Sequence, residues 1–437
     1  MLDFFFKMIN KLDENTLDVL KKSISSIFVK VIGMIAAFGI SVFLGRSIGA
    51  SGLGVVNLAN QIVMVLLVLA MFGMQHVLVK NIAISNRQNT LQNIKNSVKT
   101  AIFFNGSLAI VIATACIIFT YLFAKEVFNN PLLTTPLIIF LIAILPQTLS
   151  RVYAAAINGV GKVWQSNLFE QVLTSVFVLL ALLIGYLYDI SITIINVAIL
   201  YVSSRFLVFI IAFAYWKRVF QFPKPGNMIL KPMLQTALPL LLVSSTSVLA
   251  TNADTIMLGF LSDTEAVGLY SVASRIAMLT SFMLLVSNSA ISPKLAYMYS
   301  EGNKKGMQKM VKQTTLGVII TATIFLLLFL FFGKFILSIW GEEFRESYVP
   351  LIILCVGQFI NVSTGCSGLL LIMCGYEKLH RNISFISVTL NILLNFVGIH
   401  YFGIVGAAIA TAITIGLENL IKVYYAKKMV GILTLPI

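Results

Sequence analysis

Long apolar runs, separated by short polar segments, dominate the chain. A helix needs about 20 mostly apolar residues to cross the hydrocarbon core of a bilayer. Backbone groups in lipid have to pair within their own segment, so runs of this length predict helices. Twelve transmembrane helices are predicted, at residues 27–48, 53–75, 97–123, 133–158, 164–187, 190–216, 232–259, 266–291, 313–339, 347–374, 382–400 and 404–426.

The composition agrees with this pattern and excludes a soluble domain. Of 437 residues, 59% are hydrophobic and 11% are charged, and the mean hydropathy is +0.96. Soluble domains carry about 25% charged residues. The loops are too short to hold an enzymatic domain, and the chain has no GxxxxGK[ST] phosphate-binding motif. We therefore expect no enzyme, no catalytic or metal-binding residue and no cofactor.

The net charge of +15 would indicate nucleic acid on a soluble protein. Here most of the lysines and arginines fall in the inner segments if both termini are cytoplasmic. Only Arg46, Lys125, Lys334 and Arg345 fall at the outer ends. This asymmetry follows the positive-inside rule. It predicts cytoplasmic N- and C-termini in a cell membrane and accounts for the charge without nucleic acid.

The glycine spacing of the first two helices recurs in the second half of the chain. Gly45 and Gly54 fall on Gly259 and Gly268 when the halves are aligned without a gap. An even number of helices in each half means that both halves enter the membrane from the same side. The repeat predicts two six-helix bundles related by a pseudo-two-fold axis along the membrane normal. The predicted bundles are residues 1–216 and 232–437, joined by a cytoplasmic linker at 217–231.

Polar residues form stripes on several predicted helices. Asn57, Asn60, Gln61 and Gln75 share one face of the helix at 53–75, and Arg275 occupies the position related to Gln61 by the repeat. The helix at 232–259 carries Ser244, Ser247, Thr251, Asn252 and Asp254. Such stripes fit either a water-filled cavity between the bundles or hydrogen bonds between packed helices.

The charged residues within the spans are expected to be functional or paired. Arg46 and Arg275 are predicted contacts for an anionic substrate, although Arg46 lies near a helix end and could simply reach the membrane surface. Arg151 and Glu170 lie at one predicted depth on adjacent antiparallel helices, which favours a buried ion pair. Arg205 has no evident partner. Asp254 is interpreted as the partner of a nearby cation, with a proton site as the alternative.

Three stretches resemble the polysaccharide (O-antigen type) flippases of the multidrug/oligosaccharidyl-lipid/polysaccharide exporter superfamily. FLGRSIGASGLGVVNLANQI resembles the N-terminal signature of that family. NADTIMLGFLSDTEAVGLYSVASRI resembles its seventh and eighth helices, and INGVGKVWQSN resembles the short basic loop after its fourth helix. The length and the twelve predicted spans extend the resemblance over the whole chain.

The resemblance implies a V-shaped central cavity between the bundles, alternating access and a location in the bacterial inner membrane. The implied substrate is an undecaprenyl-pyrophosphate-linked oligosaccharide of O-antigen or lipopolysaccharide type, with a polysaccharide polymerase as a candidate partner. The implied cationic lumen is supplied here by Arg46, Arg275, Arg151 and Arg205. With the polar stripes, the predicted substrate-binding residues are Arg46, Asn57, Asn60, Gln61, Arg151, Arg205, Asn252, Asp254 and Arg275.

Three other functions stay open on the sequence. A multidrug and toxin extrusion antiporter has the same fold but typically uses a buried carboxylate in an N-terminal helix, and residues 27–48 contain no Asp or Glu. A peptidoglycan-precursor flippase usually has fourteen spans. A membrane scaffold that transports nothing is the alternative from a different class.

Overall fold

The computed structural model describes residues 14–128, 130–219 and 227–435, and every element within them is helical. Residues 220–226 of the predicted linker and 1–13 of the predicted first bundle lie outside the described residues. The α-helices are α2 (Glu14–Met71), α3 (Met74–Arg87), α4 (Leu91–Leu122), α5 (Thr134–Ile142), α6 (Ile144–Gly159), α7 (Val163–Asn167), α8 (Leu173–Leu187), α9 (Ile194–Val219), α10 (Leu230–Leu261), α11 (Thr264–Ser300), α12 (Lys304–Leu337), α13 (Tyr348–Ser363), α14 (Ser367–Met373) and α15 (Glu377–Tyr425). Short turns of 3-10 or π-helix are η1 (Phe123–Val127), η2 (Pro131–Leu133), η3 (Leu168–Val172), η4 (Glu342–Ser347) and η5 (Ala426–Val430).

Ten helical segments within the described residues are long and apolar enough to cross a membrane. Two of them, of 47 and 54 residues, are much longer than the about 20 residues that one crossing needs. Each contains a glycine with non-helical backbone, Gly49 in α2 and Gly403 in α15. The predicted boundaries at 48–53 and 400–404 therefore correspond to sharp breaks within long helices, and the all-helical membrane fold is confirmed.

The helices differ from the predicted spans in three places. Residues 76–87, predicted to be part of a loop, form most of α3. The predicted span 347–374 is interrupted between α13 and α14, where Gly365 has a φ of 65°. The predicted span 133–158 is interrupted at Ala143, between α5 and α6, because Pro146 cannot donate a backbone hydrogen bond to Ile142.

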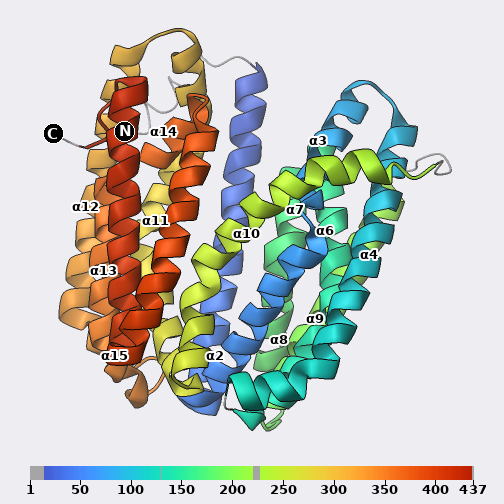
Figure 1. The fold of residues 1–437 in the computed structure, drawn as a ribbon, viewed down its shortest axis with the longest axis vertical. Coiled ribbons are helices and arrows are strands. Elements are labelled where there is room, and N and C mark those ends of the chain that lie inside the picture. Colours follow the sequence, from blue (N-terminus) through green and yellow to red (C-terminus); the bar gives the residue numbers. More distant parts are fainter. Residues whose placement is uncertain (1–13, 129, 220–226, 436–437) are drawn as a thin grey trace.

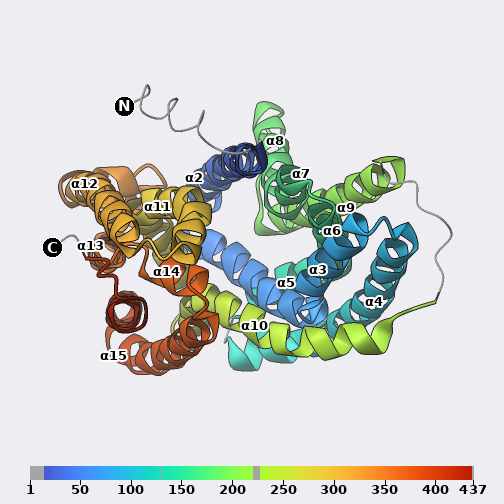
Figure 2. The ribbon, with the colours of Figure 1, turned by 90° about the horizontal axis from the view of Figure 1, so that it is seen from above.

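The helices gather into two groups that lean toward each other at one end and diverge at the other (Figure 1). One group contains α3 to α9 and the other contains α11 to α15. We call residues 14–219 the N-half and residues 227–435 the C-half. Helix α10 bends along its length, contains Pro239 and packs on α2 and α3 as well as on α15. Seen from above, α10 runs from one group to the other along one side of the molecule (Figure 2).

The halves approach most closely at the converging end, where α2 packs on α11. A Cβ atom at Gly54 would lie 1.6 Å from the carbonyl oxygen of Thr264, and one at Gly268 would lie 2.0 Å from that of Ala50. Cβ atoms do not approach backbone so closely, so glycine is required at both positions. The close packing at these two glycines joins the two halves.

A loop of the C-half caps the second part of α2 across this contact. The chain reverses its helical conformation at Gly49, whose φ is 69°. The next backbone amide, of Ala50, donates to the Oε1 atom of Glu343 on η4 at 2.7 Å. A carboxylate at the first exposed amides of a helix is favourable because it satisfies an otherwise unpaired donor and complements the helix dipole. Trp340 is fully buried beside Gly45 and donates to Ser41 Oγ at 3.0 Å.

Replacing Glu343 by alanine is expected to loosen the converging end. The Ala50 amide would lose a charged acceptor, and such a bond contributes about 1.5–3 kcal/mol. Amide hydrogen exchange at residues 49–52 should therefore become faster by about tenfold or more. Glu342→Ala is the matched control, because Glu342 is exposed and pairs only with Arg345 on the surface at 2.8 Å. Equal exchange rates in the wild type and the Glu343→Ala variant would show that the cap contributes nothing.

Candidate functional site

Arg275 lies in a large apolar pocket between the first part of α2 and α11. The cavity has a volume of about 560 Å³ and is lined by Val31, Met34, Ile35, Ala37, Phe38, Arg275, Met278, Leu279 and Phe282. Among these described lining residues, only Arg275 carries a charge. Its Nη1 donates to the carbonyl oxygen of Ala37 at 2.6 Å, across the contact between the halves. The α2–α11 pocket thus combines one fixed cation with a wall of hydrocarbon.

A second pocket, between α3 and α10, has both polar and apolar side chains in its wall. Its volume is about 290 Å³, and its lining residues are Val68, Met71, Gly73, Gln75, His76, Arg151, Val243, Ser244, Ser247 and Val248. His76 Nε2 is 3.3 Å from both Gln75 Nε2 and Ser244 Oγ, so a chain of hydrogen bonds connects α3 with α10. Polar side chains at membrane depth mark places that water or a polar ligand reaches.

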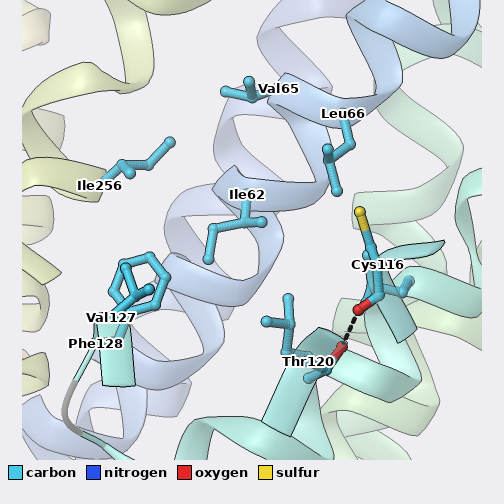
Figure 3. Close-up of a pocket in the computed structure, with 10 residues that line it drawn as sticks. Ile62, Val65, Leu66, Cys116, Thr120, Val127, Phe128 and Ile256 are labelled. Atoms are coloured by element: carbon cyan, nitrogen blue, oxygen red, sulfur yellow. Dashed lines mark hydrogen bonds between the residues drawn. The ribbon is translucent and has the colours of Figure 1, made fainter. Parts of the chain in front are cut away.

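A third pocket is almost wholly apolar (Figure 3). It has a volume of about 250 Å³ and lies between α2, α4, α5 and Ile256 of α10. Thr120 adds a hydroxyl to its wall, and that hydroxyl donates to the backbone carbonyl of Cys116 at 2.6 Å. With its one hydroxyl already engaged, the wall offers a ligand only hydrocarbon contacts. This pocket can accommodate an aliphatic chain but not a charged head group.

The predicted ion pair between Arg151 and Glu170 is not formed. Both side chains line one small cavity within the N-half, but no nitrogen–oxygen distance within 4.0 Å joins them. Glu170 lies on the π-helical turn η3, and a π-turn inserts one residue and redirects the side chains that follow. Arg151 Nη2 instead approaches the sulfur of Met64 at 3.7 Å. The predicted depth was right, but the predicted direct contact was wrong.

Arg205 is 3% exposed and points into the N-half. Its Nη2 donates to Asn60 Oδ1, and its guanidinium lies 5.4 Å from the centre of the Phe140 ring. Its Nε and Nη1 atoms have no protein partner. The cavity that it shares with Arg151 and Glu170 has a volume of about 10 Å³, close to the space that one water molecule needs. Arg205 and Asn60 therefore connect α2 with α9 inside the N-half.

Asp254 contacts neutral donors and not a cation, so the interpretation of this residue as the partner of a nearby arginine is wrong. Tyr270 and Thr411 hydroxyls donate to its Oδ2 at 2.6 Å each, and Asn395 Nδ2 donates to its Oδ1 at 2.7 Å. Asn391 extends this cluster through Asn395. Both carboxylate oxygens thereby accept hydrogen bonds from neutral groups, while Arg275 donates to the backbone of Ala37 instead.

The remaining predicted site residues are spread over the molecule. Arg46 lies exposed at the converging end, where its Nε donates to the carbonyl oxygen of Ile339 at 2.7 Å. Asn252 Nδ2 donates within its own helix to the carbonyl oxygen of Val248. Asn57 Nδ2 and Gln61 Oε1 are buried without a protein partner. The structure therefore places Arg275 and Arg151 at pockets, but it does not bring the predicted residues together in one site.

Sequence reasoning missed the partners of Asp254 and the role of Glu343. Asn391 and Asn395 lie one helical turn apart in an apolar stretch, which is a signal for a buried polar cluster. Glu343 follows Trp340 in a short polar loop and gives no comparable signal, because its contact with Ala50 depends on how the halves pack.

Comparison with known proteins identifies the family. The model of the polysaccharide biosynthesis protein family matches residues 19–299, and the MatE family model matches residues 239–397. The probable low-salt glycan biosynthesis flippase Agl15 of Haloferax volcanii is 28% identical over 188 residues, which are 41% of this chain and 38% of that protein. The capsular polysaccharide biosynthesis protein CapF of Staphylococcus aureus is 25% identical over 201 residues, 46% of this chain and 50% of that protein. The matches thus span half or less of these relatives.

Solved structures show the same fold. An inward-facing multidrug resistance MATE family transporter of the MOP superfamily superposes with a TM-score of 0.76 at 14% identity, covering 94% of this chain and 98% of that chain. The lipid II flippase MurJ, in an inward closed conformation, superposes with a TM-score of 0.72 at 14% identity, covering 93% of this chain and 87% of that chain. The expected resemblance is confirmed: this multi-pass membrane protein belongs to the polysaccharide biosynthesis protein family.

Proposed function

We propose that the protein moves undecaprenyl-pyrophosphate-linked glycan repeat units from the inner to the outer leaflet of a bacterial cell membrane. The observation that carries this proposal is Arg275 in the α2–α11 pocket. A lipid-linked glycan is an isoprenoid chain that ends in a diphosphate, and the pocket offers hydrocarbon around one guanidinium. Arginine binds phosphate oxygens through two parallel hydrogen bonds. Arg275 lies eleven residues into α11, about 16 Å from its start, so it meets the substrate deep in the membrane.

The proposed topology has twelve crossings with both termini in the cytoplasm. Each of the two long apolar segments crosses twice and reverses at its glycine, Gly49 or Gly403. The described chain has ten apolar segments, so the second crossing of each long segment brings the number of crossings to twelve. The lysines and arginines place the diverging end of the molecule on the cytoplasmic side. The converging end, with Gly54 and Glu343, is then the outer end.

Two six-helix bundles related by a pseudo-two-fold axis account for the close packing at that end. Gly54 and Gly268 are equivalent under the sequence repeat, and a Cβ atom at Gly54 would lie 3.0 Å from the backbone nitrogen of Gly268. Equivalent residues touch each other only when they lie close to the symmetry axis. The proposed units are residues 1–216 and 232–437, joined by the linker at 217–231.

Alternating access follows from this arrangement. The contacts of Gly54, Glu343 and Trp340 seal the outer end while the two groups of helices diverge at the inner end (Figure 1). Substrate enters from the cytoplasmic side, the inner ends approach each other, and the outer contacts separate to release it. Such a rocking motion about a fixed site is a general mechanism of transporters built from repeats.

A multidrug cation antiporter is the second candidate function, and Asp254 is the observation that favours it. A partly buried carboxylate without a basic partner can hold a proton or a cation. Its three neutral donors already satisfy both oxygens, and the cation in the α2–α11 pocket would repel an organic cation. These two observations make the flippase the better supported function.

Binding by the purified protein separates the two functions. Undecaprenyl diphosphate should bind to the wild type. Tetraphenylphosphonium, a lipophilic cation, should displace it only poorly. The loss of one charge-assisted hydrogen bond lowers affinity about 10–100-fold. Arg275→Ala should therefore weaken binding of the anionic lipid by that factor. Binding of tetraphenylphosphonium without binding of undecaprenyl diphosphate would favour the antiporter and contradict the flippase.

Cysteine accessibility tests the proposed topology. Single cysteines that replace exposed residues in 76–96, 217–231 and 292–312 should react only with reagents that reach the cytoplasm. Cysteines in residues 124–132 and 340–346 should react from outside, because these loops lie at the converging end. The four native cysteines are free and are first replaced by alanine or serine. Labelling of the 217–231 linker from outside would overturn both the orientation and the parallel repeat.

A further inference from the structure

We infer that the α3–α10 pocket is a subsite for the sugar part of the substrate, recognised through Gln75, Ser244, Ser247 and Arg151. The inference rests on the proposed flippase function and goes beyond it by placing the glycan. A sugar ring presents many hydroxyl groups, each a donor and an acceptor of hydrogen bonds. The pocket presents side chains of matching chemistry.

The composition of the pocket is the first argument. Its walls bring an amide, an imidazole, two hydroxyls and a guanidinium to a cavity of about 290 Å³. Ligand sites usually measure about 300–1,000 Å³, so the cavity fits a small part of a larger ligand. Because Ser247 and His76 are exposed while Gln75 and Ser244 are half-buried, these groups line an accessible surface. The lining residues of this pocket include no carboxylate, and Glu170 meets Arg151 only in the small cavity inside the N-half.

Unused hydrogen-bonding capacity is the second argument. Arg151 Nε is buried without a partner, and its Nη2 meets only the sulfur of Met64, which is a weak acceptor. Arg151 also lines the small cavity inside the N-half, so this one residue lines two cavities. A buried donor without a partner costs stability, and a ligand oxygen in the pocket would supply the missing acceptor.

The third argument is the contrast with the α2–α11 pocket. In the register that places Gly54 on Gly268, Val68 falls on Phe282 and Val248 falls on Met34. Val68 and Val248 line the α3–α10 pocket, whereas Phe282 and Met34 line the α2–α11 pocket. The two cavities therefore occupy equivalent grooves of the repeat. One of these equivalent grooves has several polar side chains in its wall and the other is almost wholly apolar. This difference suits an amphipathic ligand, whose isoprenoid chain lies on the α2–α11 side and whose sugars lie on the α3–α10 side.

The backbone around the pocket keeps α3 and α10 close together. Gly73 has a φ of 71°, and a Cβ atom there would lie 2.5 Å from the carbonyl oxygen of Ala237. This contact and the His76–Ser244 bond hold Gln75 and Ser247 at one cavity. Residues from both halves therefore form the subsite, so sugar binding depends on the relative position of α3 and α10.

The experiment compares two probes on purified protein. The first is undecaprenyl diphosphate, and the second is the same lipid carrying a disaccharide that contains glucuronic acid. The wild type should bind the glycosylated lipid about tenfold more tightly, as expected for one or two additional hydrogen bonds. In the double variant Gln75→Leu/Ser247→Ala this preference should fall to about twofold or less, while affinity for the bare lipid stays unchanged.

Unchanged binding of the bare lipid also shows that the double variant is folded. Thr246→Ala is the matched control, because Thr246 neighbours the pocket on α10, lies outside its wall and bonds only to its own helix. Arg151→Lys provides an independent test and should lose most of the preference, since lysine cannot form two parallel bonds. The inference is overturned if the double variant keeps the wild-type preference, or if the wild type has none. If the wild type binds neither lipid, the proposed function itself fails.

Discussion

Replacing Arg275 by alanine is expected to abolish glycan export in a complementation assay while the protein stays in the membrane. Arg275 provides the cation of the α2–α11 pocket. The other side chains that line the pocket are apolar and cannot bind a diphosphate. A charge-assisted hydrogen bond contributes about 1.5–3 kcal/mol, so export should fall by about 10–100-fold. Arg275→Lys should recover part of the activity, because lysine keeps the charge and loses the two parallel bonds.

Two further variants separate charge from packing at this position. Arg275→Glu should be inactive, since a carboxylate repels the diphosphate. Arg218→Ala is the control, because Arg218 is an exposed arginine in the last turn of α9 and should not affect export. Arg275 also donates to Ala37 across the halves, so immunoblotting has to show equal protein levels. Normal export by Arg275→Ala would mean that the residue only joins α2 to α11, and the flippase mechanism would lose its main support.

Alanine at Gly54 or Gly268 is expected to prevent closure of the outer end. The added Cβ atom would overlap the carbonyl oxygen of Thr264 or of Ala50. Both oxygens belong to helical backbone and cannot rotate away, and overpacking of this kind costs about 1–3 kcal/mol or more. The halves would have to separate at this end, so the inward-open state should become rare and export should fall by at least about tenfold.

Glycines in open surroundings provide matched controls for this prediction. Gly317 in α12 and Gly185 in α8 have no atom within 4 Å of an added Cβ. Alanine at these positions should be neutral or stabilise the helix by about 0.4–1 kcal/mol. Export and thermal unfolding of the four single variants, measured together, test the argument. Wild-type export by Gly54→Ala would show that the close packing of the halves is not needed during the cycle.

The sequence alone predicts most of the fold because backbone groups in hydrocarbon have to form hydrogen bonds within their own segment, which favours helices. Apolar runs predict the long apolar helices, and the repeat aligns Gly54 with Gly268, two glycines that lie where the halves meet. The runs do not predict α3, because residues 74–87 mix apolar and polar side chains in a short amphipathic helix. They also do not predict the break at Gly365, since glycine is common in membrane helices and only the packing around it decides whether the helix stops.

The site was only partly predictable because it depends on side-chain direction. The helical face that contains Gln61 and Gln75 predicts a polar surface, and of these two residues Gln75 lines the α3–α10 pocket. The repeat relates Arg275, which lines the α2–α11 pocket, to Gln61. Helical periodicity placed Arg151 and Glu170 at one depth but missed the π-helical turn η3, which directs Glu170 away from a direct contact. Two of the three donors to Asp254, Asn395 and Thr411, lie more than 100 positions away in the chain, and no local pattern connects them with Asp254.

A flipping assay with a reversible lock tests the central claim that the protein moves a lipid-linked glycan by alternating access. Ser51 and Thr264 lie on opposite halves, and their hydroxyl oxygens are 3.3 Å apart. Cysteines at both positions, in a protein without its native cysteines, should form a disulfide that holds the outer end closed. Each single-cysteine variant serves as the control.

The measurement is the transfer of undecaprenyl-diphosphate-linked oligosaccharide between the leaflets of proteoliposomes that contain the double-cysteine variant. Our account predicts transfer at the wild-type rate under reducing conditions and a loss of at least about tenfold after oxidation, with recovery when the disulfide is reduced again. Transfer that continues at the same rate with the outer end locked, or that never exceeds the rate of protein-free liposomes under reducing conditions, would contradict the account.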